Sequence, residues 1–486
     1  MFLPQISAVR KSTSKTVQFL GINKGLTTAE GELSDACGLC TNNFPVLSSR
    51  TPRATRKTLR GNRYRISKNN LIHEFGTGHI RTSTFYGFIK DSFITISDFS
   101  DKDGNLNITA LGCLNNDILV LPANRVVTIN IIDLGEKDED IPVIEIIESD
   151  SDAPVFARFL VTDDNRLWCC SSEKHEIYAS KLGDAKKWNV YKGLASDSYA
   201  VTVGSDGDFT GSASYQGYVH FFKENLIHRI YGNKPANYQI NTINQIGVKA
   251  GSEKTICEVN GCLYYLSTRG VARFDGSQAT IISKSLGNRF YGKHAGTLGK
   301  KYYITMKIDD ESEYKIYCYD TEKKIWHIED IINCEYVFCD SHLLITYVDE
   351  ENYDEESPND LFISEIEYSA QTWIDQGATT EYMGVVEPVA WYAVFAPTIE
   401  GSFDKKYISK LQLHCETGED TVFQVDIKYD NDCDFVTLAT FRGLKRETKN
   451  IPIIPKRHER FQIRIKGKGE IKLYGYTKTI SHGSEI

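Results

Sequence analysis

The sequence predicts an all-β fold in which a propeller-like body is followed by a C-terminal β-sandwich or jelly roll. The chain has 27 Tyr and 23 Phe but 3 Met, a bias toward residues that pack well on pleated sheets. No segment shows a long apolar period of 3.6 residues, which an amphipathic helix would require. A unit of turn, strand, turn and strand recurs along the middle of the chain, as in repeat architectures.

The recurring unit predicts propeller blades. Its best copies begin at Asn165, Gly217, Gly261, Lys300 and Ser341, and their spacing of about 40 to 50 residues is the spacing of four-stranded blades. Weaker copies begin near residues 85 and 116. Together they predict about six blades over residues 81–385.

Two flanking regions differ from this body. From about residue 386 to the end at 486 the alternation is longer and cleaner; Phe423, Val425, Ile427 and Tyr429 share one face of a strand, as a half-buried antiparallel sheet requires. Residues 1–80 are rich in Ser, Thr, Gly and Arg, so they are expected to form an extended arm with few strands.

Composition bounds the possible functions. A formal net charge of −9 argues against a surface devoted to binding nucleic acid. The N-terminus lacks the apolar stretch of a secretory signal, and no segment has the length of uninterrupted apolar residues that membrane insertion needs. We therefore expect a chain made in a cytosol, with its 12 cysteines reduced and mostly buried.

One local departure from the acidic mean is the candidate site. Residues 50–65 carry seven cations without an acidic residue: Arg50, Arg53, Arg56, Lys57, Arg60, Arg63 and Arg65. Such a segment suits contact with a neighbouring subunit, sequence-independent contact with DNA phosphates, or a solvated surface. We favour subunit contact and expect residues 44–65 to be exposed in an isolated monomer.

Other motifs favour structural interpretations. The CxxC of Cys37 and Cys40 lacks the second ligand pair of a zinc site, and residues 204–208, GSDGD, are expected to form a hairpin turn. The acidic run at 349–356 is expected to be solvated surface. Nucleophile elbow, HExxH and phosphate-binding glycine loop are absent from the sequence, so no catalytic residue, cofactor or metal ligand is nominated.

Three strings in combination resemble a known family. They are GELSDACGLCTNNFPVLSSRTPR from Gly31, NRLWCCSSEKHEIYASKLGDAKKWNVY from Asn165, and DSYAVTVGSDGDFTGSASYQGYVHFFKENLIHRIYGNKP from Asp197. They resemble structural proteins of phage and prophage tail modules, which are similar in turn to the packaged-DNA stabilisation proteins, also called tail accessory factors, tail hubs or nozzles, of short-tailed phages.

This resemblance implies a virion protein assembled in the host cytoplasm as a ring, often sixfold, below the portal and adaptor. The ring would retain the packaged genome and form part of its exit channel, with self, portal, adaptor and other tail proteins as partners. A carbohydrate-binding or host-receptor-binding tail protein is the alternative, with Trp391, Tyr392 or Tyr407 as stacking platforms. A third possibility, a propeller glycosidase, would need two carboxylates about 5 to 10 Å apart at the channel mouth.

Overall fold

The computed structural model describes the chain from residue 11 to residue 482 with internal gaps. The described ranges are 11–16, 18–25, 28–53, 55–60, 64–68, 71–75, 85–89, 92–96, 110–115, 117–121, 124–133, 143–154, 156–309, 311–339, 342–347, 360–366, 388–399, 405–430, 432–443 and 446–482. In some strands, among them β5 to β9, the backbone is described and the side chains are not.

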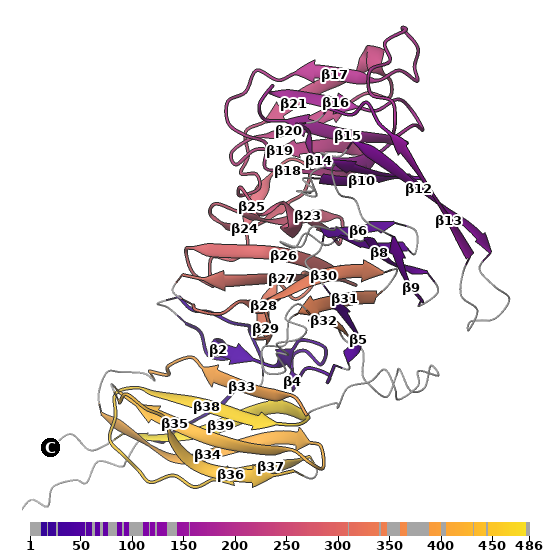
Figure 1. The fold of residues 1–486 in the computed structure, drawn as a ribbon. Helices are drawn as coiled ribbons and strands as arrows, with labels where there is room; N and C mark the ends of the chain where they lie inside the picture. Colours follow the sequence, from indigo (N-terminus) through magenta and orange to yellow (C-terminus); the bar gives the residue numbers. More distant parts are fainter. Residues whose placement is uncertain are drawn as a thin grey trace, which may run out of the picture.

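Seven four-stranded antiparallel sheets follow one another through the body of the described chain (Figure 1). Blade 1 contains β6 (Tyr64–Lys68), β7 (Leu71–Phe75), β8 (Phe85–Ile89) and β9 (Ser92–Ile96). Blade 2 contains β10 (Ala110–Leu114), β11 (Asp117–Leu121), β12 (Arg125–Asp133) and β13 (Val143–Asp150). Blade 3 contains β14 (Arg158–Asp163), β15 (Arg166–Ser171), β16 (Glu176–Ala179) and β17 (Tyr199–Thr202).

Blades 4 to 6 repeat this pattern. Blade 4 contains β18 (Gly211–Tyr215), β19 (Tyr218–Phe222), β20 (Ile227–Tyr231), the 3-10 helix η1 (Pro235–Asn237) and β21 (Gln239–Ile243). The 3-10 helix η2 (Glu253–Thr255) leads into blade 5, with β22 (Cys257–Val259), β23 (Cys262–Ser267), β24 (Gly270–Phe274) and β25 (Ala279–Ile281). Blade 6 contains β26 (Phe290–Leu298), β27 (Lys301–Ile308), β28 (Lys315–Asp320) and β29 (Ile325–Asp330).

Blade 7 closes the ring by joining distant parts of the chain. Its strands are β30 (Cys334–Cys339), β31 (His342–Tyr347), β32 (Asp360–Glu365) and, from near the N-terminus, β5 (Thr55–Arg60), which pairs with β32. The first strand of blade 7, β30, contacts the first strand of blade 1, β6, and β6 contacts β10. The body is therefore a seven-bladed propeller, one blade more than the predicted six. The five clear and two weaker copies of the repeat fall one in each blade, next to β8, β11, β15, β19, β23, β27 and β31, so the weaker copies are blades too.

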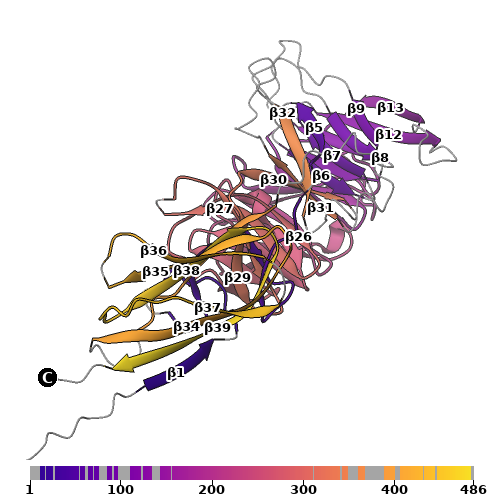
Figure 2. The ribbon, with the colours of Figure 1, turned by 90° about the horizontal axis from the view of Figure 1, so that it is seen from below.

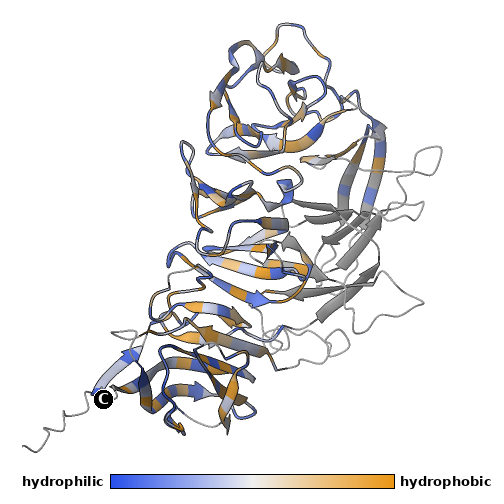
Figure 3. Ribbon diagram, turned by 90° about the vertical axis from the view of Figure 1, so that its left-hand side faces the viewer, coloured by the Kyte–Doolittle hydropathy of each residue, from blue (hydrophilic) through white to orange (hydrophobic). Residues whose placement is uncertain are grey.

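Short polar residues and glycine form tight turns of the hairpins. Asn260 and Gly261, which join β22 to β23, have φ of 49° and 71°. Both values lie in the left-handed region that Asn and Gly tolerate best. Hydrophobic and hydrophilic residues are interspersed along the described strands (Figure 3), and strands such as β15 and β23 are buried along their whole length.

The β-sandwich lies at one end of the propeller and consists of two sheets. One contains β1 (Lys11–Thr16), β3 (Leu39–Cys40), β4 (Leu47–Ser49), β34 (Lys406–Thr417), β37 (Glu447–Ile451) and β39 (Ile471–His482). The other has the order β2 (Leu33–Cys37), β33 (Ala390–Phe395), β38 (Phe461–Lys468), β35 (Val422–Tyr429) and β36 (Val436–Arg442). Phe423, Val425, Ile427 and Tyr429 are all buried, as their alternation predicted.

The prediction of an extended arm over residues 1–80 is corrected by these pairings. β1 runs antiparallel to β39 at the rim of the sandwich (Figure 2), and β2 pairs with β33. β5, β6 and β7 belong to the propeller. β1, β2 and β5 are short, and partner strands 300 or more residues away supply their hydrogen bonds, so they lack a local sequence signal.

Candidate functional site

The candidate site lies at the junction between the sandwich and blade 6. The outer strand of blade 6, β29, contacts β2 and β3 of the sandwich. A single apolar core continues across the junction, from Tyr317 and Trp326 of blade 6 to Leu33 and Trp391 of the sandwich. The segment between β4 and β5, which carries Arg50 and Arg53, crosses this boundary.

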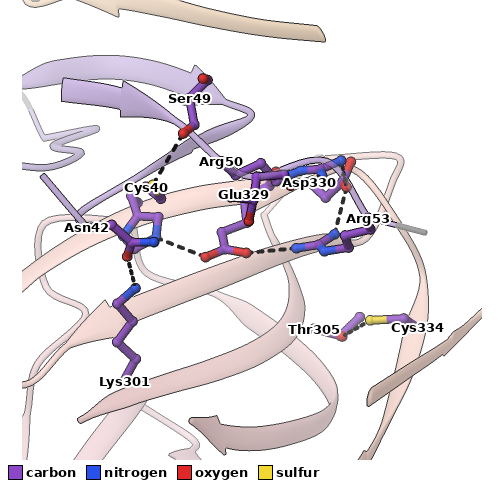
Figure 4. A network of polar contacts seen from close by, with 12 residues as sticks. Cys40, Asn42, Ser49, Arg50, Arg53, Lys301, Thr305, Glu329, Asp330 and Cys334 are labelled. Carbon is purple, nitrogen blue, oxygen red and sulfur yellow. Dashed lines mark hydrogen bonds and ion pairs between the residues drawn. The ribbon is translucent and has the colours of Figure 1, made fainter. Parts of the chain in front are cut away.

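Arg50 and Arg53 bind the two acidic residues at the end of β29 (Figure 4). The Arg50 Nη2 donates to Asp330 Oδ2 at 2.6 Å and its Nε donates to the Glu329 carbonyl at 3.1 Å. Arg53 forms a fork, with Nη1 donating to Asp330 Oδ2 at 2.8 Å and Nη2 donating to Glu329 Oε2 at 2.7 Å. Two guanidinium groups thus meet two carboxylates, and the four charges balance.

Burial makes this network strong. The side chains of Arg53 and Glu329 are 7% and 2% exposed. Burial alone would raise the pKa of the Glu329 carboxyl, but the hydrogen bond with His327 and the charge of Arg53 outweigh it and lower the pKa to about 2. Charge-assisted forked pairs of this kind fix geometry as well as supplying energy. The network therefore ties the segment that leads into β5 to the outer edge of blade 6.

The expected exposure of the basic segment is met at Thr51 but not at Arg50 and Arg53. These two arginines are mostly buried and form ion pairs within the chain. The backbone places Arg56, Lys57 and Arg60 on β5 and Arg65 on β6, but their side chains lie outside the described part of the chain. Arg63 lies outside it entirely. No local pattern points to the acidic partners, because Glu329 and Asp330 lie more than 270 residues away.

The CxxC residues are buried at the same junction. Cys37 ends β2 and Cys40 ends β3, so the two thiols lie on different sheets. Burial raises the pKa of Cys37 to about 12 and also raises that of Cys40. Both remain neutral thiols at neutral pH, which removes the reactivity that a redox pair would need.

The cysteines as a group are largely buried, as predicted. Of the eleven whose side chains are described, nine are buried, Cys257 is half-buried and Cys433 is exposed. Cys339 is the twelfth, and its side chain lies outside the described part. Structural thiols of this kind act as small apolar side chains.

The GSDGD segment connects two blades and does not form a hairpin turn within one. It follows β17 and precedes β18. The buried Lys223 donates from Nζ to the carbonyls of Ser205 and Asp206 at 2.7 and 3.2 Å. A protein cation therefore already binds the carbonyls that a calcium ion would use. The acidic run at 349–356 lies outside the described residues.

The aromatic residues suggested as sugar platforms are tied into the sandwich. Trp391 is 4% exposed and donates from Nε1 to the Gly469 carbonyl at 2.7 Å. The half-buried Tyr392 donates its hydroxyl to Asp35 Oδ2 at 3.0 Å. Tyr407 is half-buried. Trp391 and Tyr392 thus pack and form hydrogen bonds within the sandwich, so their rings are not presented as open platforms for a sugar.

A feature that the sequence did not point to is a well-anchored loop at residues 180–198, between β16 and β17. The fully buried Arg166 donates from Nη1 and Nη2 to the carbonyls of Ser180 and Ala195, each at 2.7 Å. The same loop leaves Tyr191 60% and Leu194 59% exposed. The Arg in NRLWCCS was visible in the sequence, but its role as an anchor depends on carbonyls that the loop brings back to it.

Comparisons with known proteins give likenesses of structure alone. No family model matches the chain, and no curated protein does. A Trypanosoma rangeli sialidase shares 8% identity over 96% of both chains, with a TM-score of 0.34. An exo-beta-1,3-galactanase from Phanerochaete chrysosporium shares 7% identity over 86% of this chain and 96% of its own, with a TM-score of 0.25. At these values the likenesses carry no argument about function.

The described part of the chain also has no helix with the length and apolar character needed to cross a membrane.

Proposed function

We propose that this chain is a structural component of a bacteriophage tail, which assembles as a closed ring below the portal and adaptor and surrounds the path of the genome. The proposal rests on the three strings that resemble tail hub proteins. They fall on the junction strands β2 to β4 and on blades 3 and 4. In this proposal the protein acts through its shape and its contacts, without catalysis.

The observation that carries the ring is exposed apolar surface at both ends of the molecule. At the propeller end, the 180–198 loop presents Leu182, Tyr191 and Leu194 to solvent. At the sandwich end, Val436 is 61% and Ile454 is 85% exposed. β16 and β17 lie at the opposite end of the molecule from β36 and β37 (Figure 1). Two different surfaces at opposite ends suit a head-to-tail contact, which yields a ring if the rotation closes.

The anchoring of the 180–198 loop supports its role as a docking surface. Besides Arg166, the buried Asp197 accepts the backbone N–H groups of Lys192 and Leu194. Trp188 is buried and donates from Nε1 to the Ala185 carbonyl at 2.9 Å. A loop that is already ordered loses little conformational entropy when it binds. Its exposed side chains are thus presented in a fixed geometry.

The test is the mass of the purified protein in solution at two salt concentrations, with and without its adaptor or portal. We expect a discrete ring from the wild-type chain and a monomer from the double variant Tyr191→Asp/Leu194→Asp, because two charges would have to be desolvated in the contact. The matched control is Tyr291→Asp, which changes an aromatic side chain that is 45% exposed on β26, between the two ends of the molecule (Figure 1), and should leave the ring intact.

A wild-type chain that stays monomeric with and without its adaptor or portal would overturn the ring. If that monomer were retained by host cell wall, receptor binding would replace the proposal. Deleting residues 31–65 would test the ring only if these residues formed an arm outside the fold, and they do not. It would remove β2 to β5 and with them part of both sandwich sheets and the closing strand of the propeller.

A further inference from the structure

A cysteine, a histidine and a glutamate meet on one face of blade 6. Cys318 of β28 and His327 of β29 are direct cross-strand partners, so their side chains lie on the same face. Glu329 follows two residues after His327, and residues two apart on a strand share a face. The thiol sulfur, one imidazole nitrogen and one carboxylate oxygen all lie within 4.8 Å of one another.

All three side chains are withdrawn from solvent. Cys318 and His327 are 0% exposed and Glu329 is 2% exposed. The His327 Nε2 lies 3.4 Å from Glu329 Oε1, whereas its Nδ1 is buried without a hydrogen-bond partner. A buried polar atom in this condition costs about 1–3 kcal/mol and calls for an explanation such as an ion that completes its coordination.

We propose that Cys318, His327 and Glu329 form a site for a thiophilic divalent metal ion, with Zn²⁺ as the best match. Thiolate, imidazole and carboxylate are the donors that zinc takes in proteins, whereas calcium and magnesium prefer oxygen ligands alone. Three protein ligands leave a fourth position for water. On binding, the Cys318 thiol loses its proton to solvent and metal–sulfur, metal–nitrogen and metal–oxygen bonds form.

The geometry requires a small closure of the site. Zn–S and Zn–N bonds of about 2.3 and 2.0 Å place neighbouring tetrahedral ligands about 3.5 Å apart, so separations up to 4.8 Å would shorten by about 1 Å. Rotation of the Cys318 and His327 side chains about their χ angles can supply a movement of this size. No backbone rearrangement is needed.

The positive charge of Arg53 lies next to the proposed ligand Glu329 and should weaken the binding of a metal cation. Its guanidinium binds Oε2 of Glu329, leaving Oε1 toward His327. The ion pairs of Arg50 and Arg53 with Glu329 and Asp330 are balanced, so a divalent ion with one new thiolate adds a net positive charge to the buried site. Arg53→Met removes one positive charge and should strengthen metal binding about tenfold or more, about 1.4 kcal/mol.

The experiment is titration of the chelator-treated full-length protein with Co²⁺, followed by competition with Zn²⁺. We expect one ion per chain, an absorption band from thiolate-to-cobalt charge transfer, release of one proton per ion and complete displacement by Zn²⁺. Cys318→Ala and His327→Asn should each weaken binding at least a hundredfold, and Cys318→Ala should also remove the band. Cys433→Ser, which alters an exposed cysteine, is the matched control and should keep both.

Absence of the charge-transfer band from the wild-type protein would overturn the inference, as would its persistence in Cys318→Ala. Near-ultraviolet circular dichroism of each variant in the absence of metal shows whether the propeller is intact. If both ligand variants fail that check, Arg53→Met decides: unchanged or weaker binding of Co²⁺ would contradict the site. The inference stands independently of the ring, so failure of either leaves the other in place.

Discussion

Replacing Arg53 with methionine keeps an unbranched apolar stem but removes the guanidinium fork that joins two carboxylates to the segment before β5. The pKa of Glu329 falls from an ordinary 4.5 to about 2 in the folded protein. At about 1.4 kcal/mol per tenfold change in proton affinity, this corresponds to about 3 kcal/mol of net favourable interaction with the carboxylate. Removing one partner of a buried pair costs about 3–5 kcal/mol in other proteins.

His327, Arg53 and Lys301 share in this lowering of the Glu329 pKa. Because Arg53→Met leaves buried carboxylates without a partner, we expect it to lower the free energy of unfolding by about 3 kcal/mol, measured by urea denaturation followed by tryptophan fluorescence. The double variant Arg53→Met/Glu329→Gln should recover part of this loss, because it no longer buries an unpaired carboxylate. The matched control is Arg125→Met. Its ion pair with Glu148 is exposed on both sides and should contribute less than about 1 kcal/mol. A loss below about 0.5 kcal/mol for Arg53→Met would refute the structural role of the network.

Three further predictions concern pH, the docking loop and the thiols. The lowered pKa of Glu329 means that its contribution is complete above pH 4.5 and is lost as the pH falls toward 2, so acid titration of stability should show a loss of about 3 kcal/mol that Glu329→Gln lacks. Arg166→Met should release the 180–198 loop and speed its cleavage by trypsin at least tenfold, whereas equal cleavage rates would show that Arg166 does not anchor it. Among the described cysteines, the exposed Cys433 should react first with a thiol reagent, and Cys433→Ser should remove that fast phase; a fast phase that persists would place reactive thiol elsewhere.

Closure of the propeller depends on the same N-terminal segment that is basic in sequence, because β5 (Thr55–Arg60) pairs with β32 of blade 7. The cations of residues 50–65 have no acidic residue within the segment to neutralise them. The two that are described, Arg50 and Arg53, find their partners in Glu329 and Asp330 at the end of β29. A local excess of charge was thus a sign of a long-range contact within the chain. Subunit and DNA contact remain proposals for the rest of the segment.

The amino-acid sequence by itself determined the class of the fold and the character of its strands. Aromatic and β-branched residues at alternating positions, with Asn-Gly turns such as Asn260 and Gly261, specify antiparallel hairpins through neighbouring residues. Strand burial in the sandwich, as at Phe423 and Val425, follows from the same period of two residues. These features are local, so they can be predicted without knowing what lies across the sheet.

The tertiary structure alone decided how the ends of the chain are used. The pairing of β5 with β32, of β1 with β39 and of β2 with β33 joins segments more than 300 residues apart. The ion pairs of Arg53 with Glu329 and Asp330 depend on the same kind of placement, whereas Cys318 meets His327 and Glu329 within the single hairpin of β28 and β29. Such long-range contacts form only when folding brings two distant segments together. The residues around each segment do not indicate which segment will be its partner. Closure of the propeller and the ion pairs of Arg50 and Arg53 are for this reason properties of the folded chain.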